Sequence, residues 1–215
     1  MKKNYIITIG RQLGSGGREI GLNLAESLGI SFYDKELIRL ASKESGLNEK
    51  VFESADEKKR FNIFWGLFGM HSSTQTPEIY SGYYLSNETL FKIQSDVIRS
   101  LAGEKSCLFV GRCADYILKE HPHILSIFLN ADLDDRIRRV MNVHGINERQ
   151  ARERIDKTDK QRESYYNYFS SKLWGATGSY HLCINTSVLG IEETTYFIRS
   201  FAEKKFKLRL PGKKT

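Results

Sequence analysis

Short apolar runs alternate along the chain with stretches in which hydrophobic residues recur every three or four positions. The first run, Tyr5 to Ile9, is rich in β-branched residues and ends at a glycine, which is typical of a strand buried in a parallel sheet. After Arg18 the apolar positions follow helical spacing as far as Leu28, and Gly29 supplies a helix end. The pattern predicts a strand, a glycine-rich loop and a helix.

The same alternation continues downstream. Further strands are predicted by short apolar runs at 30–33, 107–110, 124–129 and 181–185. Helices are predicted by periodic stretches at 90–101, 133–144 and 191–201, and another is expected to open at 35–41. Parallel strands need crossover connections, which are usually helices. The order therefore predicts one α/β domain with helices on both faces of a parallel sheet.

Two helix starts carry capping signals. Asp132 follows an apolar run and is placed to cap the helix predicted at 133–144. Asn147 and Gln150 have the spacing of a capping box and predict that a further helix starts there.

The segment 61–84 breaks this rhythm, because an aromatic-rich stretch is followed by a polar run. Its apolar part is too short to span a bilayer. We expect an amphipathic helix packed in a small subdomain; the alternatives are a contact between subunits of a homo-oligomer, or a mobile flap.

Composition places the chain among ordinary globular proteins. With 215 residues, 40% hydrophobic and 27% charged, it can bury a sizeable core, and long disorder is excluded. No long apolar span and no leader pattern are present, so we expect a cytoplasmic protein without a membrane partner. Cys107, Cys113 and Cys183 form no CxxC pair, and they are expected to be reduced, mostly buried thiols rather than zinc ligands.

The net charge indicates possible binding partners only when its distribution along the chain is considered. The net charge is +7, but the tail 204–215 carries +6 and the segment 136–162 carries +5, which leaves −4 for the rest. We therefore expect no general nucleic-acid partner. The tail is interpreted as solvated and mobile, with phosphate or nucleic-acid steering as the alternative.

The first loop points to phosphate. Residues 10–19 read Gly-Arg-Gln-Leu-Gly-Ser-Gly-Gly-Arg-Glu between the predicted strand and helix. Such a loop lets successive backbone N–H groups converge on an anion at a helix N-terminus. The P-loop pattern GxxxxGK[ST] fits in part: Arg11 takes the place of the first glycine and Gly17 that of the lysine. A tight turn that needs glycine only for its conformation is the alternative.

The basic segment supplies a second group of candidates. Its arginines recur three and four residues apart on the predicted helix that follows Asn147, where they repel one another unless acids or phosphates lie between them. A plain solvated helix is the other interpretation.

Several motifs together resemble those of bacterial cytidylate kinases, and more closely their divergent branch, the cytidylate kinase-like proteins. The resemblance spans roughly residues 4 to 200. It rests on motifs in the family's order, at 6–9, 13–19, 110–112, 127–131, 135–139, 159–166 and 184–187.

The resemblance implies a P-loop kinase fold: three α/β/α layers with a five-stranded parallel sheet, a helical monophosphate-binding subdomain and an arginine-rich lid. It implies a single domain over 1–203, with the subdomain at about 34–85 and the lid at about 145–170, followed by the basic tail. The implied reaction is transfer of the γ-phosphoryl group of ATP to CMP or dCMP. Mg²⁺ would be bound mainly through the phosphates, so no protein metal ligands are expected.

The resemblance also assigns roles to individual residues. Phosphates of ATP would be bound by Gly14, Ser15, Gly16, Gly17, Arg18 and Glu19 of the loop and by Arg149 and Arg154 of the lid. The acceptor would be bound by Tyr33, Asp34, Arg112, Asp159 and Arg162. Catalysis would depend on Arg18, Arg112, Asp159 and Arg162.

Three departures bear on these roles. Arg18 is the cation next to Gly17, so it is the candidate substitute for the absent lysine. Glu19 places a carboxylate beside the loop that would bind the phosphates, and it would repel them unless a metal ion or Arg18 intervenes. Ile155 stands where classical members have an arginine. A catalytically weak nucleotide-binding regulator and a kinase for another small acceptor are therefore alternatives to a nucleoside monophosphate kinase.

Overall fold

The computed structural model describes residues 4–34 and 87–208. The chain divides into two compact units, one of residues 1–34 with 99–215 and one of residues 35–98. The predicted helix at 35–41 and the aromatic segment 61–84 lie outside the described residues, as do most of the expected subdomain and the end of the tail.

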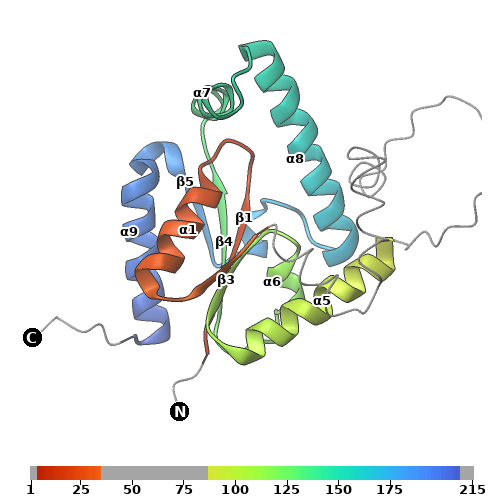
Figure 1. Cartoon of the computed structure of the whole chain (residues 1–215), viewed down its shortest axis with the longest axis vertical. Coiled ribbons are helices and arrows are strands. Elements are labelled where there is room, and N and C mark those ends of the chain that lie inside the picture. Colours follow the sequence, from red (N-terminus) through yellow and green to blue (C-terminus); the bar gives the residue numbers. More distant parts are fainter. Residues whose placement is uncertain (1–3, 35–86, 209–215) are drawn as a thin grey trace, which may run out of the picture. The chain divides into compact units, whose positions relative to one another are not determined.

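A five-stranded sheet forms the centre of the first unit (Figure 1). Every pair of neighbouring strands is parallel, and the strand order is β2-β3-β1-β4-β5. The strands are β1 Ile6–Arg11, β2 Ser31–Tyr33, β3 Cys107–Val110, β4 Ile124–Asn130 and β5 Leu182–Asn185. The expected α/β fold with a five-stranded parallel sheet is confirmed.

Helices occupy the periodic stretches. They are α1 Gly17–Leu28, α5 Asn87–Glu104, α6 Ala114–Ile117, α7 Leu133–His144, α8 Glu148–Ser170 and α9 Thr186–Phe206, with a short 3₁₀ turn, η1, at Thr177–Ser179. The prediction of a last helix at 191–201 was too short at both ends. It missed the turn before Gly190, where a φ of 73° interrupts the helix.

The main core lies between the sheet and the helices α1 and α9, which pack together on one face (Figure 1). Ile7 and Ile9 of β1 contact a cluster that includes Leu24 of α1 and Ile198 of α9, all almost fully buried. The helix α6 contacts β1 from the opposite side. Because β1 is central and buried on both faces, the loop that follows it starts from a rigid base.

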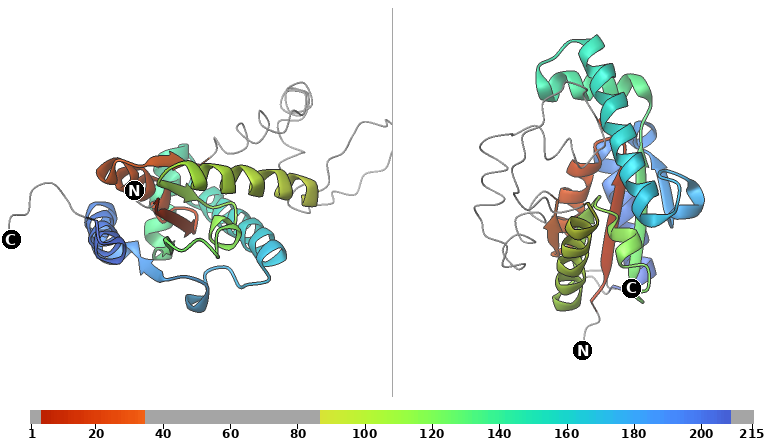
Figure 2. Two further views of the ribbon diagram at one scale, coloured as in Figure 1. Left: turned by 90° about the horizontal axis from the view of Figure 1, so that it is seen from below. Right: turned by 90° about the vertical axis from the view of Figure 1, so that its right-hand side faces the viewer.

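A second, smaller core joins α7 to α8 beyond the carboxyl end of β4 (Figures 1 and 2). Val140 of α7 and Ile155 of α8 are buried there, and Leu13 of the glycine-rich loop packs against the same cluster. The predicted capping box of Asn147 and Gln150 is present at the start of α8. This core holds the arginine-rich helix against the loop.

The cap predicted at Asp132 is only partly right. Asp132 occupies the N-cap position of α7, but its side chain makes no capping hydrogen bond. Its Oδ1 instead accepts a hydrogen bond of 2.8 Å from Asn185 Nδ2 at the end of β5.

Candidate functional site

The glycine-rich loop ends in a helix N-terminus that is open to a ligand. Gly14 and Gly16 have φ values of 81° and 76°, a left-handed conformation that favours glycine. No side chain caps α1, and the first bond of this turn runs from Ile20 N to Gly16 O at 3.0 Å. The N–H groups of the first helical turn therefore have no acceptor within the helix, which makes this end suited to an anion.

Close packing from α7 leaves no room for a side chain at Gly14. A Cβ there would lie 2.6 Å from the carbonyl oxygen of Arg136. The loop and the start of α7 are therefore in direct backbone contact.

Side chains from three helices hold the loop by its carbonyl groups. The Leu13 carbonyl accepts from Arg136 Nε at 2.7 Å, and the Gly14 carbonyl accepts from Arg139 Nη1 at 2.9 Å. The Arg11 carbonyl accepts from Arg162 Nη1 at 3.0 Å, and the Ser15 carbonyl from Thr186 Oγ1 at 2.8 Å. These bonds fix the loop conformation before any ligand binds.

Asp159 of α8 joins the helix to the loop. Its Oδ1 accepts from Leu13 N at 2.8 Å, and its Oδ2 forms an ion pair with Arg136 Nη2. Arg162 Nη1 lies 3.6 Å from Oδ1. Burial raises the pKa of Asp159, and the Leu13 N–H and the two guanidinium groups oppose this shift. The predicted acceptor residues Asp159 and Arg162 are thus both at the loop.

Asp34, just after β2, pairs with two arginines of the loop. Arg18 Nε is 3.0 Å from Asp34 Oδ2, and Arg11 Nη2 is 3.5 Å from Asp34 Oδ1. The Arg18 side chain is 63% exposed, and its guanidinium lies 5.8 Å from the centre of the Phe32 ring. Arg18 is therefore directed toward the end of β2. Tyr33 stacks on Phe109 with 5.3 Å between ring centres.

The pKa of Arg11 responds to the guanidinium groups of Arg162 and Arg112, and the pKa of Arg162 responds to that of Arg112. Burial is the main cause, and together with the charges of Arg162 and Arg112 it lowers the pKa of Arg11 to about 9. Burial also lowers the pKa of Arg112 and of Arg162, and Asp34 opposes all three shifts. We call Arg11, Arg112 and Arg162 the guanidinium cluster. Confined positive charge of this kind favours a bound anion.

Arg112 enters this cluster from the end of β3. It follows Gly111, and both residues have positive φ values, 60° for Arg112 and 78° for Gly111. A left-handed arginine is uncommon, and such conformations gather at functional sites.

A buried polar contact anchors α8 beside the cluster. Tyr166 donates a hydrogen bond of 2.7 Å to Asp115 Oδ2 of α6, three residues after Arg112. Burial raises the pKa of both Asp115 and Tyr166.

Trp174 lies edge-on to Phe128, with 5.1 Å between ring centres, and Tyr180 packs on the same ring, so this aromatic group is part of the packing.

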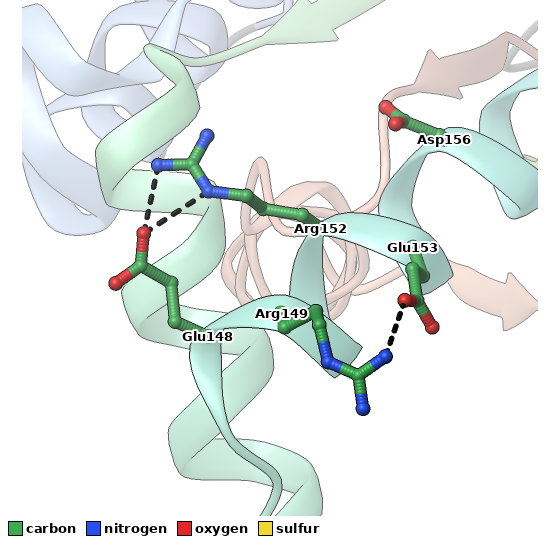
Figure 3. Close-up of a pocket in the computed structure, with 5 residues that line it drawn as sticks. All are labelled: Glu148, Arg149, Arg152, Glu153 and Asp156. Carbon is green, nitrogen blue, oxygen red and sulfur yellow. Dashed lines mark hydrogen bonds and ion pairs between the residues drawn. The ribbon is translucent and has the colours of Figure 1, made fainter.

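The two lid residues predicted to bind ATP lie on the exposed side of α8. Arg149 pairs with Glu153 at 3.2 Å, Arg152 pairs with Glu148 at 2.8 Å, and Arg154 is exposed. A surface hollow of about 470 Å³ is lined by these two pairs and Asp156, whose side chain makes no dashed contact in Figure 3. Three carboxylates against two guanidinium groups give it no excess of positive charge. The ATP-binding roles of Arg149 and Arg154 stay predictions.

Sequence reasoning missed roles for Arg11, Arg136 and Arg139. The run 135–139 was visible as a motif, but only the folded chain shows that its arginines bond to loop carbonyls. Ile155, interpreted as a lost arginine, is 1% exposed in the core between α7 and α8.

Within residues 4–34 and 87–208, no three His, Cys, Asp or Glu side chains are grouped so that they could hold a metal ion. No helix in these ranges has the length and apolar character needed to cross a membrane.

Comparison with known proteins agrees with this architecture. An uncharacterized protein from Eubacterium ventriosum is 28% identical, with a TM-score of 0.69 over 93% of this chain and 99% of that one. A shikimate kinase from Bacteroides thetaiotaomicron is 13% identical, with a TM-score of 0.53 over 93% and 98% of the two chains. A gluconokinase from Sinorhizobium meliloti is 12% identical, with a TM-score of 0.53 over 96% of each chain. At such identities the two kinases show the fold alone.

Sequence comparison reaches the family. No curated protein sequence matches the chain. The model of the cytidylate kinase-like family matches residues 6–188 of this chain, which is most of the chain's length. With a P-loop kinase fold and a family match of this extent, the chain belongs to the cytidylate kinase-like family.

Proposed function

We propose that this protein transfers the γ-phosphoryl group of ATP to a nucleoside monophosphate, CMP or dCMP, and forms the diphosphate and ADP. One observation carries the proposal: the guanidinium cluster, drawn from β1, the end of β3 and α8, adjoins a loop whose N–H groups suit an anion. Phosphoryl transfer asks a protein mainly to position two polyanions and to neutralise charge on their oxygens.

Each element has a task in this reaction. The N–H groups of residues 14–18 would hold the ATP phosphates, and Arg112 the phosphate of the acceptor. Tyr33 and Asp34 would border the acceptor, and Asp159 would hold Arg162 over the transferring group. An acceptor phosphate oxygen forms a bond to the γ-phosphorus while the bond to the β–γ bridging oxygen breaks, and that oxygen leaves on ADP with the electron pair.

Both left-handed glycines let the loop pack closely, Gly14 against Arg136 of α7 and Gly16 against Ile191 of α9, which supports a fixed loop for the phosphates. Mg²⁺ bound together with ATP would neutralise phosphate charge, and it would be held largely by the phosphates and water. Glu19, which is exposed in the first turn of α1, is the carboxylate that lies nearest in sequence to residues 14–18, which are proposed to hold the phosphates.

ADP release measured over all common nucleoside monophosphates, with and without Mg²⁺, tests the proposal. We expect release only when ATP, Mg²⁺ and an acceptor are all present, with CMP and dCMP the best acceptors. Arg112→Ala and Arg162→Ala should each lower turnover by about 100- to 1,000-fold without unfolding the chain. Arg138→Ala, whose exposed side chain pairs with Asp135, is the matched control. Rates like those of the wild type in both site variants would contradict the assignment.

A catalytically weak nucleotide-binding regulator is the second candidate. It is favoured by Gly17 and Glu19 in the loop and by the pairing of Arg18 with Asp34. Tight binding of ATP or CMP in calorimetry, with no transfer to any acceptor, would support it. Transfer only to an acceptor other than a nucleotide would show a third function, a kinase for another small molecule.

A further inference from the structure

The loop has no lysine at the P-loop position, and the structure shows why no side chain fits there. A Cβ added at Gly17 would lie 2.7 Å from Arg11 Cβ and 3.1 Å from Arg11 Cγ. These atoms belong to the stem of the arginine, close to its backbone, and cannot move away as a flexible tip could. The Arg11 stem therefore occupies the space that a side chain at position 17 would enter.

The guanidinium group of Arg11 extends from this stem toward the end of β3. A Cβ on Gly111 would overlap Arg11 Nη1, so the guanidinium packs directly against the backbone that precedes Arg112. Arg11 Nη2 lies 3.5 Å from Asp34, and 20% of the side chain is exposed. Arg11 thus runs from the start of α1 to the arginine expected to hold the acceptor phosphate.

Arg136, Arg139 and Arg18, which also lie around the loop, are directed elsewhere. Arg136 and Arg139 donate to the carbonyls of Leu13 and Gly14, on the α7 side of the loop. Arg18, the neighbour of Gly17 in sequence, points to Asp34 and the Phe32 ring. Arg11 pairs with Asp34 and lies near two other guanidinium groups. Burial, together with these two positive charges, lowers its pKa to about 9 although Asp34 and Asp159 oppose the shift. An anion at this point would relieve their repulsion.

We propose that Arg11 replaces the P-loop lysine: its guanidinium contacts the β- and γ-phosphates of bound ATP from the position that the first glycine of the usual loop leaves empty. The loop departs from the usual pattern twice, with arginine in place of the first glycine and glycine in place of the lysine. In this proposal the two changes compensate each other, because they move the cationic side chain from the start of α1 to the end of β1. This inference rests on the proposed function, because it assigns the triphosphate to the loop.

Calorimetry with two ligands isolates the phosphate contact. Arg11→Gln should weaken binding of Mg²⁺–ATP by about 10- to 100-fold, the value of one charge-assisted contact. Binding of adenosine, which has no phosphates, should stay within about twofold of wild type. Arg199→Gln is the matched control, because Arg199 also has one acidic partner, Glu203 at 2.7 Å, but on α9. It should leave both affinities unchanged.

An exchange of residues tests the replacement itself. Gly17→Lys alone forces a stem against Arg11 and should lower Tm by about 3 to 10 °C. Arg11→Gly alone should lose ATP affinity as Arg11→Gln does. The double variant Arg11→Gly/Gly17→Lys restores the first glycine and the lysine of the usual loop, so it should fold and recover at least about tenfold in ATP affinity over Arg11→Gly.

A measurement on the unaltered chain needs no variant to fold. Arginine-directed dicarbonyl reagents label exposed guanidinium groups, and mass spectrometry locates the label. ATP should protect Arg11 at least about fivefold against labelling, and adenosine should not.

The outcomes separate this inference from the proposed function. If the wild type binds ATP but Arg11→Gln binds it equally well, or loses ATP and adenosine together, Arg11 has only a structural role and the inference is wrong. Equal labelling of Arg11 with and without ATP would also overturn it. A wild-type chain that binds no ATP would remove the proposed function and this inference with it.

Discussion

Two stretches of the same helix use the same residue types differently. In the outer stretch of α8, residues 148–156, Arg149 and Arg152 pair with acids one turn away, and their side chains are 79% and 46% exposed. In the inner stretch, residues 157–166, Arg162 is 23% exposed and reaches the carbonyl of Arg11. The outer stretch borders the hollow of Figure 3, and the inner stretch borders the phosphate loop.

Because the two stretches differ in this way, the number of arginines in a segment does not locate a phosphate site. Each outer arginine forms an ion pair with an acid one turn away, which any isolated helix could form. Such exposed pairs contribute little to the free energy of unfolding. An inner side chain bonds to residues nearly 150 positions away, as in the contact of Asp159 with Leu13. Ile155, near the inner end of the outer stretch, packs in one core with Leu13 and so holds the following turns of the helix at the loop.

The largest expected effect comes from Asp159. Asp159→Ala would leave Arg136, only 8% exposed, without its carboxylate, and would also remove the acceptor of the Leu13 N–H. Breaking a buried ion pair on one side costs about 3 to 5 kcal/mol of unfolding free energy. Denaturant unfolding measures this loss. Glu153→Ala in the outer stretch should change stability by less than about 0.5 kcal/mol; equal losses in both variants would remove the distinction.

Ile155 tests the core that positions the inner stretch. Ile155→Ala empties a fully buried site and should cost about 2 to 4 kcal/mol. Because Leu13 packs on the same cluster, ATP affinity should fall as well. Urea unfolding and calorimetry on one preparation give both values. Ile155→Val, which keeps most of the volume, serves as the control and should cost about 1 kcal/mol. A stable Ile155→Ala variant would show that α8 is held in another way.

Phosphate should stabilise the free protein through Arg11. Its pKa is lowered from 12.5 to about 9, so between these values the unfolded chain holds the proton and the folded chain does not. Unfolding free energy therefore rises with pH across that range, and below pH 9 the cost of the charged group is present in full.

Near neutral pH, inorganic phosphate that binds Arg11 should offset this cost and raise Tm by about 2 to 4 °C. Thermal unfolding in phosphate and in a chloride buffer of equal ionic strength measures the shift. The shift should be smaller in Arg11→Gln. An equal shift in Arg152→Ala and Arg11→Gln would contradict a specific anion site.

The smallest effect is expected at Arg152. Its pair with Glu148 is exposed, so Arg152→Ala should change unfolding free energy by about 0.3 to 0.5 kcal/mol and leave ATP affinity unchanged. Loss of ATP affinity in this variant would move the phosphate site to the outer stretch.

Local patterns were enough to predict most of the fold. The apolar runs became β1 to β5, and Gly29 ended α1 as expected, because apolar patterning and helix ends depend on neighbouring residues. The break at Gly190 was missed because a helical stripe gives no sign of a single positive φ within it.

The site was less accessible to sequence reasoning. Spacing drew attention to Arg18 as the substitute for the missing lysine because the two positions are adjacent. The structure turns Arg18 toward Asp34 and brings Arg11 against Gly17 instead. This contact joins residues six positions apart, and it depends on left-handed glycines and on packing by α7, neither of which is visible in a motif.

The central claim is that one pocket holds both polyanions. The most direct test is calorimetric titration with a single molecule in which adenosine and cytidine are joined 5′ to 5′ through five phosphates. We predict one molecule bound per chain, at least about 100-fold more tightly than ATP, because the second half binds without a further loss of translational freedom. Binding no tighter than that of ATP, or two molecules per chain, would contradict the account.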